Sequence, residues 1–191
     1  MYNFDTYKGP SFSVGNRMLR VLWGFISFFL FQYSPKPLHA WRSFLLRCFG
    51  AKVGQGVHVY PKVKIWAPWN LELSDECGIG NGVILYSQDK IRIGRRTVVS
   101  QGAHLCAGTH DYSKSGFPLV TMPIDIGDNV WIATEAFVHP GITIGKGCII
   151  GARAVVTGDM PEEMICAGHP CKPIKARSFI EEPTNYNEEF I

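Results

Sequence analysis

The sequence predicts a mainly β protein, built as a β-solenoid with helices at its N-terminal end. Aliphatic residues recur at every sixth position from residue 53 onward, which is the signature of a solenoid with short strands. The 20 glycines and 12 prolines indicate many turns and argue against an all-helical chain. With 191 residues, 46% apolar and 18% charged, the chain is long enough for one globular domain with a real core.

The N-terminal segment combines a loose arm with an apolar stretch. Residues 1–17 read as the arm, and residues 21–35 contain no charged side chain and a run of aromatic residues. A membrane span needs about 20 apolar residues, so this stretch falls short. Three interpretations stay open for residues 18–33: packing on the protein or across an oligomer interface, peripheral contact with a membrane surface, and a true span.

A second helix is expected after the Ser-Pro-Lys-Pro segment at 34–37. Its apolar positions recur at helical spacing, and they are Trp41, Phe44, Leu45, Cys48 and Phe49. Arg42 and Arg47 fall off that face. Gly50 stands where the end of a helix favours a residue with positive φ.

The six-residue period covers about 53–160. Seventeen positions in this pattern all carry Val, Ile or Leu, although these types supply only 42 of the 191 residues. They are Val53, Val59, Ile65, Leu71, Leu73, Ile79, Leu85, Ile91, Ile93, Val99, Leu105, Ile126, Ile132, Val138, Ile144, Ile150 and Val156. The pattern needs two slips of two residues, at 71 and 91. Each aliphatic is expected to point inward and stack on its equivalents, giving roughly six triangular coils with one continuous core.

One loop interrupts the repeat at residues 111–125. A regular solenoid that ejects one loop usually has a functional reason, because loops on rigid scaffolds carry sites. We therefore divide the chain into an arm with helices at 1–50, a solenoid at 51–160 and a tail at 161–191.

Charge and cysteine usage exclude several classes of protein. A net charge of +3 is too small to indicate a nucleic-acid partner. None of the six cysteines forms a Cys-x-x-Cys pair, and no signal peptide is evident. We therefore expect free thiols that are buried at all six positions, and a cytoplasmic location with membrane association as an open addition.

Five motifs resemble the hexapeptide-repeat acyltransferases. They are Gly-Thr-His-Asp at 108–111, Ile-Gly-Asp-Asn-Val-Trp-Ile at 126–132, Pro-Gly-Ile-Thr-Ile-Gly at 140–145, Ile-Gly-Ala at 150–152 and Ala-Gly-His-Pro at 167–170, the last followed by Lys172 and Lys175. The likeness covers about 50–177. It is greatest to the sugar O-acetyltransferase branch of maltose, galactoside and nodulation acetyltransferases, and above all to colanic-acid-type exopolysaccharide acetyltransferases.

The resemblance implies a left-handed parallel β-helix, a homotrimer with sites between subunits, acetyl-CoA as co-substrate and a sugar or polysaccharide-precursor acceptor. It implies no resident metal. The matching position makes His110 the catalytic base. The positions expected to contact CoA are Trp131, Thr134, Ala152, Thr157, Lys172 and Lys175. The chain departs from the family at Thr157-Gly158, where a lysine often follows the threonine, so Lys172 and Lys175, or Arg153 in its place, must supply the cations for the CoA phosphates.

Other roles for the candidate residues stay open. Tyr86 and Asp111 are candidate acceptor contacts, and Asp111 serves equally well as a solvated loop residue. Trp131 precedes an inward aliphatic and is expected to point outward, into a site or a subunit seam. Cys106 is an alternative nucleophile to be tested if His110 fails.

Other functions are also weighed. Transfer to an amine rather than a hydroxyl is the first alternative. A γ-carbonic-anhydrase-like metal enzyme would share the prism, but His104 and His110 are not spaced as the His-x-x-x-x-His pair that such a site needs. A structural trimer without catalysis would not bind CoA.

Overall fold

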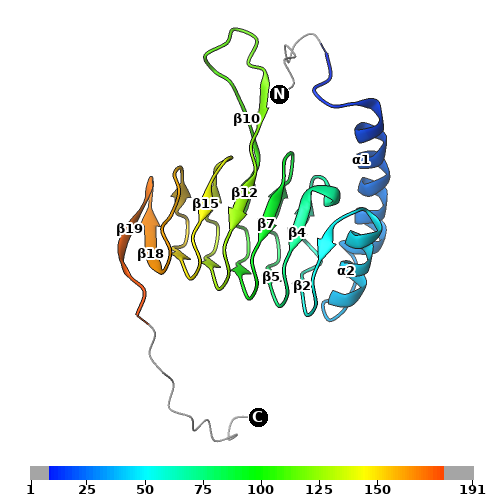
Figure 1. The fold of residues 1–191 in the computed structure, drawn as a ribbon. Helices are drawn as coiled ribbons and strands as arrows, with labels where there is room; N and C mark the ends of the chain where they lie inside the picture. Colours follow the sequence, from blue (N-terminus) through cyan, green and yellow to red (C-terminus); the bar gives the residue numbers. More distant parts are fainter. Residues whose placement is uncertain (1–8, 179–191) are drawn as a thin grey trace, which may run out of the picture.

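Residues 9–178 are described by the structure, a computed structural model, and they form a triangular β-solenoid with two helices at one end (Figure 1). The helical elements are α1 (Val14–Ile26), its π-helical continuation η1 (Ser27–Phe31), α2 (His39–Cys48) and the short 3₁₀ turn η2 (Pro68–Asn70).

Three parallel sheets make up the walls of the solenoid. Sheet A contains β1 (Lys52–Val53), β4 (Leu71–Leu73), β7 (Ile91–Ile93), β12 (Ile124–Ile126) and β15 (Thr143–Ile144). Sheet B contains β2 (His58–Val59), β5 (Gly78–Ile79), β8 (Val98–Val99), β13 (Trp131–Ile132), β16 (Ile149–Ile150), β18 (Met164–Gly168) and β19 (Cys171–Ala176). Sheet C contains β3 (Lys64–Ile65), β6 (Ile84–Tyr86), β9 (His104–Cys106), β14 (Phe137–Val138) and β17 (Val155–Val156).

The expected core is confirmed. Of the seventeen aliphatic positions, sixteen are buried, and Val53 packs against the core from the open end of the first coil. Each turn that carries these positions places at least one aliphatic on every sheet, so like residues stack between coils and exclude water from the core.

The two slips in the repeat mark a change in coil length. Before the hairpin, Glu72 pairs in register with Arg92, whereas after it Asp125 pairs with Thr143, so the earlier coils are longer than the later ones. The extra residues lie at the corner between sheets C and A. There the strands β4, β7 and β12 each point two aliphatic side chains inward instead of one.

The ejected segment leaves from this same corner. It is a β-hairpin of β10 (Gly108–His110) and β11 (Leu119–Thr121), and it stands clear of the solenoid in Figure 1. The predicted loop, 111–125, is therefore shifted: the strands of the hairpin begin at Gly108, and Ile124 and Asp125 already belong to sheet A, where they pair with β7. Ile124 is fully buried, which returns the chain to the core earlier than the six-residue pattern indicates.

The other boundaries also differ in detail from expectation. The first helix begins at Val14, inside the predicted arm, because the Ser13 hydroxyl accepts a hydrogen bond from the Asn16 N–H and caps it. The predicted tail at 161 still carries the solenoid: β18 pairs in parallel with β16, and only β19 turns back antiparallel to close sheet B.

The second helix confirms the expected position but buries a different face. Arg42, Ser43, Leu45 and Leu46 are buried against the first coil, whereas Trp41, Phe44 and Cys48 are exposed. The Arg42 guanidinium makes this possible, because it donates to the carbonyl oxygens of Val59, Pro35 and Lys36 and to the Ser34 hydroxyl. Gly50 ends the segment with φ +84°, as expected.

Candidate active site

His110 lies at the end of β10, exposed on the hairpin. Its Nδ1 is 2.7 Å from the carbonyl oxygen of Phe117, across the turn of the hairpin. A carbonyl can only accept, so the neutral ring must carry its proton on Nδ1 and keep the lone pair on Nε2. Phe117 has φ +41°, a left-handed backbone conformation that turns its carbonyl toward the ring. The hairpin thus fixes one tautomer and leaves a basic nitrogen free.

Asp111 is occupied within the hairpin turn. Its Oδ1 accepts hydrogen bonds from the Ser113 hydroxyl and N–H, and Lys114 Nζ lies 3.2 Å from its Oδ2. These bonds, that of the Ser113 hydroxyl foremost, lower the pKa of the Asp111 carboxyl below its ordinary value. Its role toward the acceptor stays a prediction, and its contacts here order the loop.

Tyr86 lies at the base of the hairpin. Its carbonyl accepts from the Ala107 N–H, and its hydroxyl accepts from Gln88 Nε2 at 3.0 Å. The oxygen of that amide, Gln88 Oε1, is buried without a hydrogen-bond partner among the described residues. A Cβ on Gly108 would lie 1.8 Å from this oxygen, so any other residue at this position requires the Gln88 side chain to move. The sequence analysis did not identify Gln88. Its position one coil below Gly108 was the feature that could have predicted its place at the base of the hairpin.

His104 extends this cluster along sheet C. Its ring lies between those of Tyr86 and Phe137, at centroid distances of 6.3 and 4.9 Å. Its Nε2 is buried without a hydrogen-bond partner within the described part of the chain, and burial lowers the pKa of its imidazole. Cys106, the alternative nucleophile, points its thiol at the Gly108 carbonyl, 3.2 Å away, rather than at His110.

Trp131 and Lys175 share one row on the outer face of sheet B. Trp131 pairs with Ile149, Ile149 with Ile165, and Ile165 with Lys175, so the four residues lie in register across adjacent strands. Adjacent strands lie about 4.8 Å apart, so the backbone of Trp131 lies roughly 14 Å from the backbone of Lys175, three strands away. The Trp131 indole is 48% exposed, as expected, and is fixed by a hydrogen bond from Nε1 to the Ser100 hydroxyl.

The remaining candidates lie at two corners. Thr134 and Ala152 follow paired strands at the corner between sheets B and C, where the Thr134 carbonyl accepts from the Arg153 N–H. Thr157 follows β17 at the corner between sheets C and A. Arg153 forms an exposed ion pair with Glu135, with Nε 2.6 Å from Oε2. Such surface pairs are weak, so this guanidinium can be released to an anionic ligand.

The cavities beside α1 and α2 are lined by neither His110 nor Trp131 nor Lys175. Among residues 9–178, no group of three or more His, Cys, Asp or Glu side chains is placed to hold a metal ion.

Comparison with known proteins agrees with this architecture. The family description "Bacterial transferase hexapeptide (six repeats)" matches residues 123–158. The putative colanic acid biosynthesis acetyltransferase WcaF of Escherichia coli K12 is 42% identical over 174 residues, covering 91% of this chain and 94% of the relative. The galactoside O-acetyltransferase of the same organism is 31% identical, covering 70% of this chain and 68% of its own.

Solved structures show the same fold. A maltose O-acetyltransferase from Clostridium difficile 630 superposes with a TM-score of 0.80 at 26% identity, covering 87% of this chain and 90% of its own. A galactoside acetyltransferase in complex with coenzyme A gives the same TM-score at 24% identity, covering 88% and 86%. The chain therefore belongs to the hexapeptide-repeat acetyltransferases, enzymes built on a parallel β-helix.

Proposed function

We propose that this enzyme transfers the acetyl group of acetyl-CoA to a hydroxyl of a sugar or polysaccharide precursor, with His110 as general base. The hydrogen bond between His110 Nδ1 and the Phe117 carbonyl carries the proposal, because in the neutral ring it assigns the proton to Nδ1 and keeps the lone pair on Nε2. A sugar hydroxyl holds its proton too tightly to attack at neutral pH, while a thioester is already activated. A positioned base is the missing element.

The reaction proceeds by direct transfer. His110 Nε2 takes the hydroxyl proton as the acceptor oxygen attacks the thioester carbonyl. The tetrahedral intermediate carries its negative charge on the former carbonyl oxygen, which needs a hydrogen-bond donor. Its collapse breaks the carbon–sulfur bond, and the departing thiolate of CoA takes the proton back from the imidazolium. The products are the acetylated sugar and free CoA, and no covalent enzyme intermediate is needed.

The outer face of sheet B is the proposed track for acetyl-CoA. Trp131 supplies an apolar surface for the pantetheine arm, and Lys172 and Lys175 supply cations for the phosphates at the far end of the row. Thr134, Ala152 and Thr157 are proposed to complete the contacts. Among the relatives, the galactoside acetyltransferase was solved with coenzyme A.

The active unit is proposed to be a homotrimer. The hairpin with His110 and the row from Trp131 to Lys175 arise from different walls of the protomer, at the corner between sheets C and A and on sheet B. A hairpin that stands clear of its own solenoid is placed to reach a neighbour (Figure 1). The simplest arrangement that uses both the hairpin and sheet B brings His110 of one subunit next to the thioester bound on sheet B of a neighbouring subunit.

The decisive test follows thiol release from acetyl-CoA over a panel of free, lipid-linked and polymeric sugars, with amino sugars included. His110→Ala should lose about 10²- to 10⁴-fold in turnover, the usual cost of removing a general base. CoA binding, measured by thermal shift, should persist. His58→Ala, an exposed histidine on the first coil, is the matched control and should keep its activity. Near-normal turnover of His110→Ala would overturn the mechanism, and acetylation of amines alone would overturn the proposed acceptor class.

A further inference from the structure

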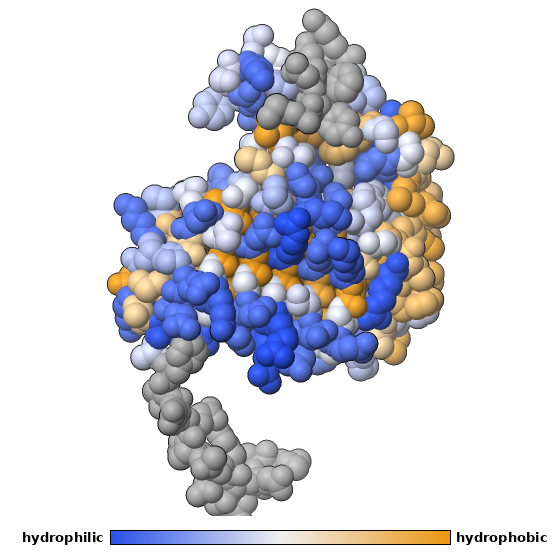
Figure 2. All heavy atoms as spheres, viewed as in Figure 1, coloured by the Kyte–Doolittle hydropathy of each residue, from blue (hydrophilic) through white to orange (hydrophobic). Residues whose placement is uncertain are grey.

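The helical end of the solenoid carries a broad apolar surface that no described part of the chain covers. The outward side chains of α1 and η1 are largely exposed, and they are Val14, Met18, Val21, Leu22, Phe25, Phe28, Phe29 and Leu30. Figure 2 shows this surface as an orange band at one end of the molecule. Exposed apolar patches of this extent mark interaction sites rather than ordinary solvated surface.

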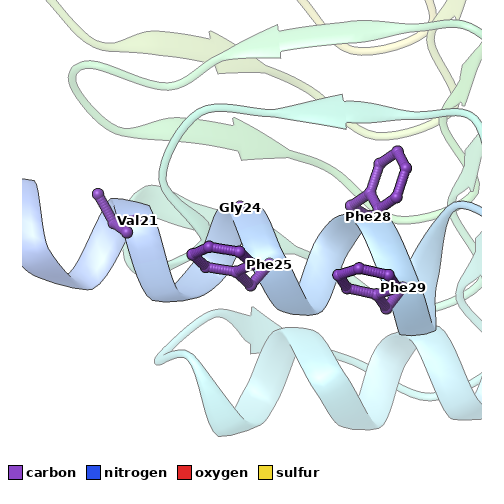
Figure 3. Close-up of a pocket in the computed structure, with 5 residues that line it drawn as sticks. All are labelled: Val21, Gly24, Phe25, Phe28 and Phe29. Atoms are coloured by element: carbon purple, nitrogen blue, oxygen red, sulfur yellow. The ribbon is translucent and has the colours of Figure 1, made fainter.

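The surface continues onto α2. The exposed rings of Trp41 and Phe44 stack at a centroid distance of 5.8 Å, and the Trp41 Nε1–H donates to the Leu30 carbonyl of η1. A groove of about 430 Å³ lies on α1 and η1, lined by Val21, Gly24, Phe25, Phe28 and Phe29 (Figure 3). The outward faces of both helices therefore form one apolar surface, which we call the cap face.

The opposite side of the helices is fixed to the first coil. Trp23 is 2% exposed and donates its indole N–H to the Ile65 carbonyl at 2.9 Å, and Phe31 is fully buried. The expectation that the apolar stretch is too short for a membrane span is corrected here: the helix begins earlier, at Val14, and by length and composition Val14–Phe31 would suffice to cross a membrane. It cannot span a bilayer while these contacts hold, because the first coil, with its polar surface, would have to enter the hydrocarbon. If the cap face meets a bilayer, these contacts restrict it to the bilayer surface.

The positive charge of the N-terminal part of the chain indicates which kind of surface the cap face would bind. Between residues 6 and 71 the sequence contains nine lysines and arginines and no aspartate or glutamate, whereas residues 72–191 contain ten cations and fifteen acidic residues. Arg17 on α1 and Lys36 between the helices are both exposed. Exposed cations on the elements that carry an apolar face are complementary to an anionic lipid surface, and they would repel a second copy of the same face.

From the cap face and its charge, we propose that α1, η1 and α2 dock the enzyme onto the surface of an anionic bilayer. The aromatic side chains enter the boundary between headgroups and acyl chains, and Arg17 and Lys36 meet the lipid phosphates. This inference does not depend on the proposed reaction, since it concerns a surface separate from His110 and Trp131.

Vesicle flotation tests the proposal with the full-length enzyme. We expect the protein to float with vesicles of phosphatidylcholine and phosphatidylglycerol, and to bind pure phosphatidylcholine far less. The triple variant Phe25→Ser, Phe28→Ser, Phe29→Ser should lose binding, because it removes the inserting side chains without touching the core. Ile174→Ser, an exposed apolar residue at the far end of the solenoid, should bind as wild type does.

A charge variant tests the second half of the argument. Arg17→Gln with Lys36→Gln should weaken binding to the anionic vesicles by on the order of 10-fold or more, since each surface cation contributes roughly fivefold in affinity. Salt should weaken wild-type binding in the same direction. Failure of the wild type to float, or retention of binding by the triple variant, would overturn the proposal. So would a triple variant of altered oligomeric state, which would assign the cap face to a second copy, or resistance of bound protein to carbonate extraction, which would indicate a span.

Discussion

At the residue scale, the candidate base depends on a small set of local contacts. His110 keeps its free nitrogen because a backbone carbonyl takes the other one, and that carbonyl is presented by the left-handed backbone of Phe117. Beneath it, Gly108 leaves room for Gln88, whose amide is bonded to Tyr86. The base of the hairpin is thus packed against the coil below.

Replacement of Gly108 by alanine tests this packing. The added methyl would meet Gln88, so the side chain must leave its bond to Tyr86, and stability should fall by about 1–3 kcal/mol, the usual cost of overpacking. Activity should fall with it. Gly78→Ala, which meets nothing within 4 Å, is the control, measured alongside by urea denaturation. The double variant Gly108→Ala, Gln88→Ala should recover stability, and a double variant no better than the single one would contradict the packing argument.

The half-buried His104 gives a prediction about pH. Burial lowers the pKa of its imidazole in the folded state, so the unfolded chain binds the proton more readily. At neutral pH the imidazole is neutral in both states, so this effect on the free energy of unfolding is absent. The free energy of unfolding should fall as pH drops below about 6.5, by at most about 1.4 kcal/mol per pH unit for one proton. His39, whose pKa burial also lowers, acts in the same direction.

Urea denaturation of His104→Gln between pH 7.5 and 5 checks this sign. The variant should show a flatter decline than the wild type, with the His39 contribution remaining. An equal or steeper decline would mean that the His104 ring is not desolvated in the folded protein.

At the scale of elements, the docking of the helices onto the first coil depends on a buried cation. Arg42 fills the interface between α2 and the coil, and its guanidinium satisfies the carbonyls of the α1–α2 connection and of β2. This contact turns the aromatic side of α2 outward, which creates the cap face. An arginine on the inner side of a helix is thus the physical reason for an apolar outer surface.

Arg42→Met should therefore cost on the order of 3 kcal/mol, because a methionine fills the space but removes the charged hydrogen bonds to the buried Val59 carbonyl and to the partly buried carbonyls of Pro35 and Lys36. Arg47→Met is the matched control: Arg47 bonds the carbonyls of Val53 and Gly54 but is exposed, so its loss should cost less than about 1 kcal/mol. Unfolding followed by the fluorescence of the buried tryptophan would measure both. Equal losses in the two variants would show that burial is not what makes Arg42 important.

At the scale of the whole molecule, the candidate site residues lie on different walls of the solenoid. Longer coils give way to shorter ones after the hairpin, so the irregularities of the first half collect at the corner between sheets C and A. The hairpin leaves from this corner, while Trp131 and Lys175 lie on sheet B. A site that uses both is therefore proposed to need more than one copy.

Mixed trimers test this arrangement. His110→Ala and the double variant Lys172→Ala, Lys175→Ala should each be impaired alone, at limiting acetyl-CoA. In a statistical one-to-one mixture, refolded together, roughly a quarter of the sites would combine an intact hairpin from one copy with an intact sheet B from its neighbour, so about a quarter of wild-type activity should return. Separately folded and then mixed proteins are the control. An inactive mixture would place the whole site in one protomer.

The sequence by itself determined the solenoid and its core. A period of six predicts an inward aliphatic in each strand, and sixteen of the seventeen predicted positions are buried because burial of aliphatic side chains dominates each coil in the same way. The motifs around His110, Trp131 and Lys175 could also be identified from the sequence, because each belongs to a short contiguous segment. The pattern of Val, Ile and Leu likewise predicted that the repeat is interrupted, although it did not predict the residues at which the interruption begins and ends.

The tertiary structure decided what depends on partners distant in the chain. The hairpin ends at Thr121 because Ile124 pairs with Ile91 of the preceding coil, a long-range register that no local pattern contains. The inner face of α2 was likewise decided by carbonyls that only the folded chain offers to Arg42, against the apolar periodicity of its own sequence. Periodicity reports how hydrophobic a face is, whereas the side that is buried depends on which polar groups meet their partners there.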